Sequence, residues 1–250
     1  TLAADSIQLR SGGDTTLKGA TATANRIDAD IKGRLNIESV QDQMAQQSKQ
    51  SGGGVRVQIS LGTAWEASGN FNQSKSSGSS QSVNQQSGLF AGEGGYHINA
   101  QSVHLKGGAI ASTAPAEQNA LTAGSLTWEN IQNQSSYSAS AASLSGSYGS
   151  NSPSQNPDNA AFRESALGQA FANSASSSRP GFTPGLPAHE SGVDGSTTYA
   201  TISAGRLNIG GKATSVEELG IHSNPESAHR QIKALPDLPQ LMQNQQTVAA

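Results

Sequence analysis

The chain has 250 residues, of which 13% are charged, 4% aromatic and 34% hydrophobic, with a formal net charge of −3. Disordered proteins combine low hydrophobicity with high net charge, so the small net charge argues against that class. The absence of a Lys/Arg cluster argues against a nucleic-acid surface, and no run of 18 apolar residues predicts a membrane-spanning helix. A polar, uncharged chain suits a thin repetitive structure that buries one narrow stripe per repeat. Because the chain opens at Thr1 in mid-pattern, without Met or a signal peptide, we expect an internal stretch of a longer protein.

Short alternating strands open the chain and return after 20 residues. Ile7 is followed by Ile27, and Leu17 by Ile37, each at that spacing. Alternation of apolar and polar residues buries one face of a strand and leaves the other in water. A period of about 20 with two or three strands per period predicts a parallel β-solenoid, in which coils stack about 4.8 Å apart. An ordinary antiparallel β domain would show the same alternation and stays open as the alternative.

This pattern assigns an interior and predicts sharp corners. Leu17, Ile27, Leu35 and Ile37 are expected to face the interior, and glycines after the strands are expected to supply the positive φ of the corners. The pattern returns over 98–110 and more faintly over 200–210.

Residues 41–95 differ from the repeats. An alternating strand at 55–61 is followed by a Ser-rich polar stretch at 74–82 that has nothing to bury. We therefore expect an excursion from the solenoid over about 41–95, made of two strands joined by a flexible tip. The stretch 72–88 is expected to be mobile and protease-sensitive because it cannot offset the entropy of ordering its backbone.

A third patterned block runs over 121–149 and completes the region 1–149 expected as repeats. Residues 150–191 are expected to be a linker with a short helix at about 159–172, and the Pro-containing stretch 174–192 is expected to be mobile. Residues 192–250 are expected to hold the last strands of the array and then a helical segment. Helix starts are indicated there by the capping box that begins at Ser215 and by Asn224 followed by Pro225.

No motif of catalysis or cofactor binding is found along the chain. It lacks the Gly-x-Ser-x-Gly elbow and the phosphate loop, and Asp14 fits a turn aspartate that bonds its own backbone. The histidines show no metal-ligand spacing and have no cysteine partners, so solvent-facing positions are expected for all of them. They are His97, His104, His189, His222 and His229. We predict no catalytic, cofactor-binding or metal-binding residues and no cofactor.

One strand face and two aromatic residues leave an enzymatic or sugar-binding alternative open. Arg26, Asp28, Asp30 and Lys32 share the polar face of one strand, and their mixed signs favour a solvated, self-paired face over an acid–base site. Trp128 and Tyr137 could stack on sugars, although a Trp here more often plugs the core or caps its end. The alternative function is therefore a carbohydrate-binding or polysaccharide-cleaving β-helix protein.

Four segments carry a resemblance to a known family. Residues 12–20, with Gly-Gly-Asp followed by Thr-Thr-Leu-Lys-Gly-Ala, resemble the haemagglutinin repeat of filamentous haemagglutinins and of contact-dependent growth inhibition exoproteins. The segments 55–61 and 126–133 are similar to the same family, and 198–209 resembles the segment that ends its repeat arrays. The second repeat departs from the pattern, with Lys-Gly-Arg at 32–34 where Gly-Gly-Asp is expected.

The resemblance implies a fold, a route and a role. Such proteins pass through an outer-membrane two-partner-secretion transporter and fold outside as a right-handed parallel β-helix. We thus expect an all-β solenoid with an inserted hairpin excursion and short C-terminal helices, secreted to the surface of a Gram-negative bacterium. The implied role is structural and adhesive, with contact to receptors on host or neighbouring cells or presentation of a C-terminal toxin. The resemblance implies no enzyme activity in the repeats and no nucleic-acid partner.

Overall fold

The computed structural model describes residues 1–59, 65–149, 181–184, 188–237 and 240, with the backbone alone at 52–59, 65–72, 142–149, 181–184 and 188. The described part is all-β, as predicted, and its helices are single turns: η1 (Ala116–Gln118), α3 (Val216–Leu219) and η2 (Pro225–Ser227). None of its helices is long and apolar enough to cross a membrane. The chain divides into two compact units: 1–44, 80–135 and 194–234 form the first, and 45–79, 136–193 and 235–250 form the second.

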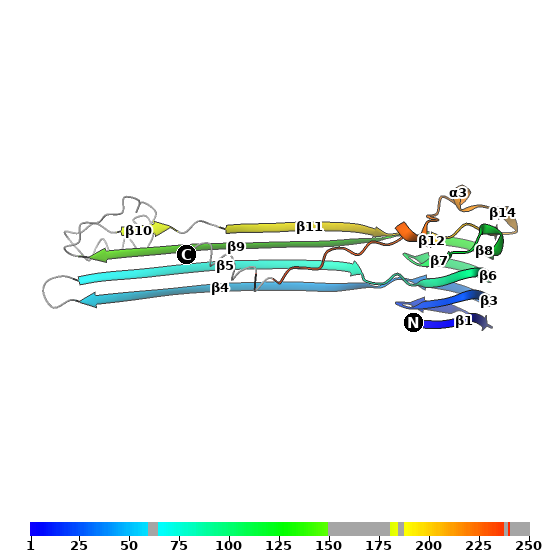
Figure 1. Ribbon diagram of the computed structural model, residues 1–250, viewed down its shortest axis with the longest axis horizontal. Coiled ribbons are helices and arrows are strands. Elements are labelled where there is room, and N and C mark those ends of the chain that lie inside the picture. The colour runs from blue at the N-terminus through cyan, green and yellow to red at the C-terminus, as the bar shows by residue number, and fades with distance from the viewer. Residues whose placement is uncertain (60–64, 150–180, 185–187, 238–239, 241–250) are drawn as a thin grey trace. The chain divides into compact units, whose positions relative to one another are not determined.

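Parallel strands stacked side by side build the first unit (Figure 1). We call each level of this stack a rung. Every pairing between successive rungs is parallel. Rung 1 is β1 (Leu2–Ser11) and β2 (Thr15–Lys18), rung 2 is β3 (Thr21–Glu38), rung 3 is β6 (Gly88–Lys106), rung 4 is β7 (Ala109–Ser112) and β8 (Ala120–Glu129), and rung 5 is β12 (Thr201–Ile202) and β13 (Arg206–Ile209).

The rungs are in register, so equivalent side chains stack on one another. Ile7 pairs with Ile27, and Leu17 pairs with Ile37, which confirms the predicted 20-residue step. One apolar ladder crosses all five rungs and forms part of the hydrophobic core. Its members are Leu9, Ala29, Ile98, Leu121 and Leu207.

Three of the four predicted interior residues are fully buried, namely Ile27, Leu35 and Ile37. Leu17 is half-buried and packs against the core from β2, which pairs only with β3 in the described part of the chain. A side chain in rung 1 therefore has a stacking neighbour on one side, whereas one in rung 2 has neighbours on both sides.

Corners between strands use glycine as predicted. Gly19 and Gly107, which follow β2 and β6, have φ of 60° and 53°. Gly95 within β6 has φ of 70°, and a Cβ there would lie 2.2 Å from the carbonyl oxygen of Gln118. Non-glycine residues adopt this left-handed region only at a steric cost, so the sequence can turn at these points only with glycine.

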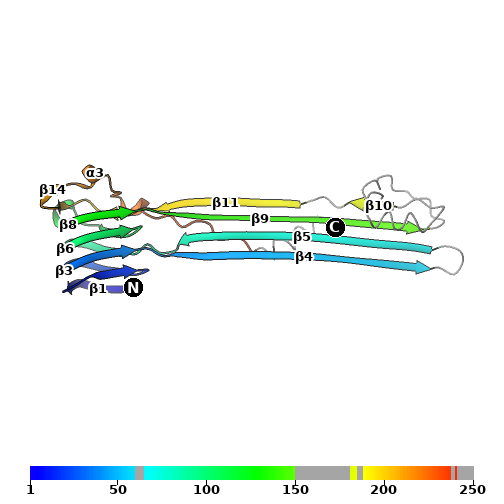
Figure 2. The same ribbon diagram turned by 180° about the vertical axis from the view of Figure 1, so that it is seen from behind.

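A second sheet is inserted between the rungs. It contains β4 (Gln41–Ile59), β5 (Trp65–Val83), β9 (Ile131–Gly149), β10 (Gly181–Pro184) and β11 (Ala188–Thr198), in the order β10-β9-β5-β4 with β11 also on β9. The arrowheads of β4 and β5 point in opposite directions (Figure 2). The chain thus leaves the rungs twice, between β3 and β6 and between β8 and β12, and β9 lies in a region that the sequence had suggested as repeats.

The expectation that 72–88 is mobile is wrong. This stretch continues β5 to Val83, and β6 begins at Gly88. Ser74, Ser76 and Ser82 are buried in alternation with exposed neighbours. The polar composition misled the prediction because ladder hydrogen bonds satisfy a strand backbone whatever its side chains are.

The last described residues contain the two predicted helix starts. Ser215 caps α3 by accepting from the backbone N–H of Glu218, and Asn224 caps η2 by accepting from that of Glu226. Hairpin strand β14 (Lys212–Thr214) pairs antiparallel with β13. The helix expected at about 159–172 lies outside the described residues, as does the linker at 150–191 apart from 181–184 and 188–191, which are in strands.

Candidate functional site

The charged face of β3 pairs with itself, as predicted. Its even-numbered side chains are directed outward while the odd-numbered ones between them are buried. Arg26 donates two hydrogen bonds of 2.9 Å to Asp28, and the Lys32 ammonium donates to Asp30 at 3.0 and 3.1 Å. The hydrogen bond from Arg26 lowers the pKa of Asp28. Each carboxylate is neutralised by its own strand neighbour, an arrangement that serves stability rather than proton transfer.

His97 lies beside this face on the next rung, in register with Asp28. Its Nδ1 is 3.6 Å from the Asp28 carboxylate, too far for a hydrogen bond, and is buried without a partner. Burial lowers the pKa of His97, Arg26 and Arg206 lower it further, and Asp28 opposes them. The imidazole is therefore neutral at pH 7, and the contact with Asp28 is not an ion pair.

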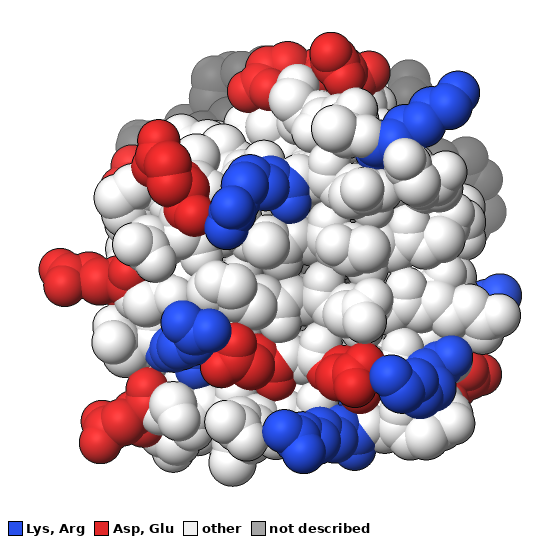
Figure 3. Space-filling view, turned by 90° about the vertical axis from the view of Figure 1, so that its right-hand side faces the viewer, with Lys and Arg blue, Asp and Glu red and all other residues white. Residues whose placement is uncertain are grey.

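A second row of charges alternates in sign along the stack. Lys18, Glu38, Lys106 and Glu129 occupy equivalent positions of rungs 1 to 4. Ion pairs of 3.3 Å and 3.2 Å join Lys18 to Glu38 and Lys106 to Glu129. The face drawn in Figure 3 likewise places acidic and basic side chains side by side. We call this row the charge ladder; with its mixed signs it does not attract a polyanion.

A polar pocket of about 390 Å³ opens along the charge ladder. His104 lines it from rung 3, and its Nδ1 lies 2.8 Å from the Thr127 hydroxyl of rung 4. Asp14 and Arg34 also line it. Since acids and bases here are mutually paired, the arrangement favours rung-to-rung cohesion.

Asp14 does not bond its own turn, so that prediction is wrong. Its carboxylate accepts from the backbone N–H of Arg34 on the next rung at 2.8 Å, and Gly33 N–H donates to the Gly13 carbonyl at 3.2 Å. A Cβ at Gly33 would lie 2.3 Å from Asp14 Oδ1. The local turn bonds come from Ser11 instead. The departure from Gly-Gly-Asp in the second repeat is thus the contact surface for the first.

A buried amide, missed from the sequence, lies where the chain passes between rungs and second sheet. Asn133 Oδ1 accepts from the backbone N–H of Val83 at 2.9 Å and from the Gln41 amide at 3.2 Å. Its Nδ2 donates to the Thr198 hydroxyl at 2.8 Å. These partners come from β4, β5 and β11, so one side chain fastens three strands. Composition alone gave no signal for it in a chain rich in Asn.

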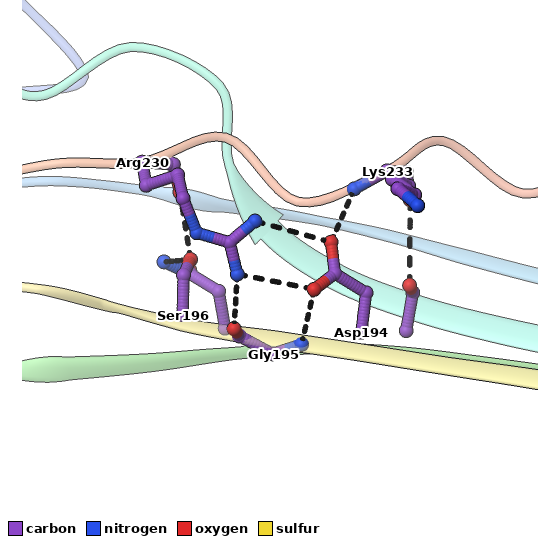
Figure 4. Close-up of polar contacts among 7 residues, drawn as sticks. Asp194, Gly195, Ser196, Arg230 and Lys233 are labelled. Carbon is purple, nitrogen blue, oxygen red and sulfur yellow. Dashed lines mark hydrogen bonds and ion pairs between the residues drawn. The ribbon is translucent and has the colours of Figure 1, made fainter.

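Asp194 of β11 forms the densest polar contact of the described residues (Figure 4). It accepts from the Arg230 guanidinium at 3.0 Å and from the backbone N–H groups of Gly195 and Lys233 at 2.9 and 2.8 Å. Ser196 donates to the Arg230 carbonyl at 2.7 Å. The Arg230 hydrogen bond, then that of Lys233, lowers the pKa of Asp194 to about 2. We call this group the Asp194 clasp; it fastens the irregular C-terminal segment to β11.

An aromatic pocket of about 360 Å³ forms where rung 5 stops short. β13 pairs only with residues 120–123 of β8, so Trp128 at the end of β8 has no partner in rung 5. Tyr199 and His222 stack beside it, with ring centroids 4.7 Å apart. Trp128 packs against the core, as expected of a core plug, but it also lines this pocket. The full lining is Trp128, Asn130, Tyr199, Val216, Glu217, Gly220, Ile221, His222 and Ser223.

The remaining aromatic and histidine predictions are met only in part. Tyr137, the second suggested sugar-stacking residue, does not line the aromatic pocket and hydrogen-bonds Glu190 at 3.2 Å. Only His189 among the five histidines is exposed; the other four are half-buried. Solvent-facing positions were therefore wrong for those four. In the part of the chain that the structure describes, no three His, Asp or Glu side chains gather as metal ligands.

The comparisons with known proteins place these features in context. Residues 1–53 match the family described as the hemagglutinin repeat. A protein named Toxin CdiA from Escherichia coli is 31% identical and one named Deoxyribonuclease CdiA from Dickeya dadantii 34% identical, each over 94% of this chain. A tRNA nuclease CdiA from Yersinia mollaretii is 36% identical over 55% of the chain. The chain spans 7% of the length of the first two relatives and 5% of the third. No solved structure matches it.

Proposed function

Because the chain is a haemagglutinin-repeat region of the contact-dependent growth inhibition exoproteins, a segment of a large secreted protein of the Gram-negative cell surface, we propose that it is a load-carrying spacer of such a filament. In this role it holds adhesive surfaces away from the cell or presents a C-terminal toxin to a neighbour. Its partners are then the outer-membrane two-partner-secretion transporter and receptors on the contacted cell.

The observation that carries this proposal is the in-register stack of parallel rungs. β3 pairs through its first half with β1 and through its second half with β2, with register shifts between Ala24 and Arg26 and between Ile31 and Arg34. One strand of rung 2 therefore follows the bends of rung 1 above it. Such stacking, repeated over five rungs, is what a right-handed parallel β-helix requires, and it makes stability a sum of similar rung-to-rung interfaces.

A non-enzymatic role agrees with the chemistry of the charged groups. Asp28, Asp30 and Asp194 each accept from a cationic side chain, and Asp14 accepts from a backbone N–H. Carboxylates held in this way are ionised and already hydrogen-bonded, whereas general acid–base catalysis needs a group whose pKa lies near the working pH. We propose that the segment itself catalyses no reaction.

In-frame deletion of this segment from a full-length exoprotein tests the spacer role. Immunodetection on intact cells measures display, and a co-culture assay measures contact-dependent adhesion and inhibition of neighbours. We expect display to persist and contact-dependent activity to fall, because the filament would be shortened and its surfaces lost. Thr23→Ala, an exposed change on β3, is the control and should alter neither readout. Unchanged adhesion and inhibition after the deletion would contradict the proposal.

A further inference from the structure

The aromatic pocket has the composition of a ligand site and no part in the rung-to-rung contacts described above. It combines aromatic rings, an amide, a carboxylate and a hydroxyl at the place where rung 5 leaves β8 uncovered. We propose that this pocket binds a neutral pyranose unit of a polysaccharide. The proposal is independent of the spacer role, because a filament can act as a spacer with or without a bound sugar.

The backbone holds the aromatic rings of the pocket in place before any ligand arrives. Tyr199 N–H donates to the Ala228 carbonyl at 2.8 Å, and the Tyr199 carbonyl accepts from Gln86 at 2.7 Å and from Thr201 at 3.0 Å. The His222 ring is held at both nitrogens, with Thr201 Oγ1 3.1 Å from Nδ1 and Ser227 Oγ 3.2 Å from Nε2. Rings fixed in this way lose little conformational entropy on binding, which favours affinity.

The polar groups of the lining offer both a donor and an acceptor. Asn130 Oδ1 accepts from the backbone N–H of Ala200 at 2.9 Å, which orients the amide. Its Nδ2 has no partner among the described residues and remains a donor. The Glu217 carboxylate is exposed on α3 and accepts, and the Ser223 hydroxyl can do either. Sugar hydroxyls need such mixed partners, while the apolar C–H faces of a pyranose ring pack on aromatic rings.

Charge and size narrow the ligand to a neutral sugar. Glu217 is the charged residue of the lining and no Lys or Arg belongs to it, so uronates and other anionic sugars are repelled. An alkylammonium ion would also favour Glu217, but such cations are held best by several open aromatic faces. Here Tyr199 and His222 cover a face of one another. A volume of about 360 Å³ is at the small end of ligand pockets, roughly 300–1,000 Å³, and suits one or two sugar rings.

Fluorescence of Trp128 gives a direct test. The chain has two tryptophans, so Trp65→Phe leaves Trp128 as the sole reporter. This protein is titrated with maltohexaose, cellohexaose, chitohexaose, a β-galactan oligosaccharide, polygalacturonate and tetramethylammonium chloride. We expect saturable quenching by at least one neutral oligosaccharide and affinity at least about tenfold weaker, or about 1.4 kcal/mol, for the acidic polymer and the cation.

Two variants and one control tie any signal to the pocket. Tyr199→Ala removes an aromatic face, and Asn130→Asp keeps the acceptor for Ala200 while removing the amide donor; each should weaken binding on the order of tenfold. Tyr137→Ala, an aromatic change outside the lining, should leave binding unchanged, and circular dichroism checks that all variants fold. Quenching by none of the neutral sugars, equal binding of polygalacturonate or tetramethylammonium, or equal effects of Tyr137→Ala and Asn130→Asp would each overturn the proposal.

Discussion

At the scale of the residue, the number of stacked neighbours sets how much each apolar side chain contributes. Ile27 lies in register between Ile7 of rung 1 and Tyr96 of rung 3 and is fully buried. Leu17 has Ile37 on one side only and is half-buried. Sequence alternation assigned both to the interior correctly in direction, but could not rank them, because the rank depends on which rungs follow.

Truncation of these two residues should separate them clearly. Ile27→Ala removes fully buried methylenes and leaves a cavity, and should lower the free energy of unfolding by about 2–5 kcal/mol. Leu17→Ala should cost less than half of that, since its side chain already contacts water. Urea denaturation followed by circular dichroism measures both, with Thr23→Ala as an exposed control on β3. An equal or larger loss for Leu17→Ala would contradict the assigned order of burial.

The Asp194 clasp predicts a specific acid dependence. The pKa of Asp194 is lowered from 3.8 to about 2 in the folded chain, so the folded state favours the ionised carboxylate. Its stabilising contribution is present above pH 4 and is lost as the pH falls toward 2. Asp28 is shifted in the same direction and acts in the same acidic range.

Asp194→Asn should therefore reduce the melting temperature at pH 6 but flatten its decline between pH 4 and pH 2. Thermal melts at several pH values measure this, and Asp237→Asn serves as the control at an exposed carboxylate. The decline should be shallower and not absent, because Asp28 still titrates. A variant whose decline is as steep as that of the parent would show that the clasp does not couple to folding.

At the scale of the element, glycine corners decide where a strand can bend. Gly95 combines a φ of 70° with a site where a Cβ would lie 2.2 Å from a backbone oxygen. Gly12 has neither restriction, since nothing lies within 4 Å of its ideal Cβ. The sequence pointed to glycines after strands, and Gly19 and Gly107 agree. Gly95 lies inside a strand, where no local pattern marks a corner.

Gly95→Ala should destabilise the chain by roughly 2 kcal/mol or more, from left-handed strain and overpacking together. Gly12→Ala should be nearly neutral or slightly stabilising, because it only restricts the unfolded chain. Both are read from denaturant midpoints. Comparable midpoints for the two variants would mean that β6 does not turn at Gly95.

The charge ladder provides a second test at this scale. Lys106→Glu would place a carboxylate between Glu38 and Glu129 on adjacent rungs, and like charges directly opposite one another are destabilising. Exposed pairs contribute roughly 0–1 kcal/mol, so a modest fall in melting temperature is expected, smaller at high salt.

The matched double variant Lys106→Glu/Glu129→Lys restores an opposite pair between rungs 3 and 4 and should recover part of the loss. Lys18→Glu, which meets a single acidic neighbour in rung 2, is the control and should cost less. A loss independent of salt, or no recovery in the double variant, would show that register does not govern these contacts.

At the scale of the whole molecule, the repeats could be predicted from the sequence and the insertions only in part. The 20-residue return of Ile7 at Ile27 reports pairing between consecutive rungs. Rung 3 pairs with rung 2 across the 49 residues between Glu38 and Gly88, so no short period marks it. The Ser-rich part of β5 was misread because its stability comes from strand pairing rather than from apolar burial.

The aromatic pocket shows the same division. Trp128 stood out as one of two tryptophans, whereas Tyr199 and His222 lie far along the chain and meet it only because rung 5 pairs with rung 4. The clasp depends on contacts between β11 and a segment without regular structure. Such long-range partners are determined by the fold and leave no spacing for a sequence argument to detect.

The central claim is that successive rungs are parallel and in register, and disulfide mapping between rungs 3 and 4 tests it most directly. The chain has no cysteine, so introduced pairs report without background. Parallel register places Asn99 opposite Thr122 and His104 opposite Thr127. An antiparallel pairing of the same strands would instead join Asn99 to Thr127 and His104 to Thr122.

We therefore predict rapid oxidation of the double-cysteine variants Asn99→Cys/Thr122→Cys and His104→Cys/Thr127→Cys, since adjacent strands hold the Cα atoms within the separation of roughly 4.4–6.8 Å that a disulfide spans. The crossed pairs, Asn99→Cys/Thr127→Cys and His104→Cys/Thr122→Cys, should stay reduced under the same conditions, as read from gel mobility and thiol titration. Bond formation in the crossed pairs and not in the matched ones would contradict the parallel stack, and with it the spacer role built on it.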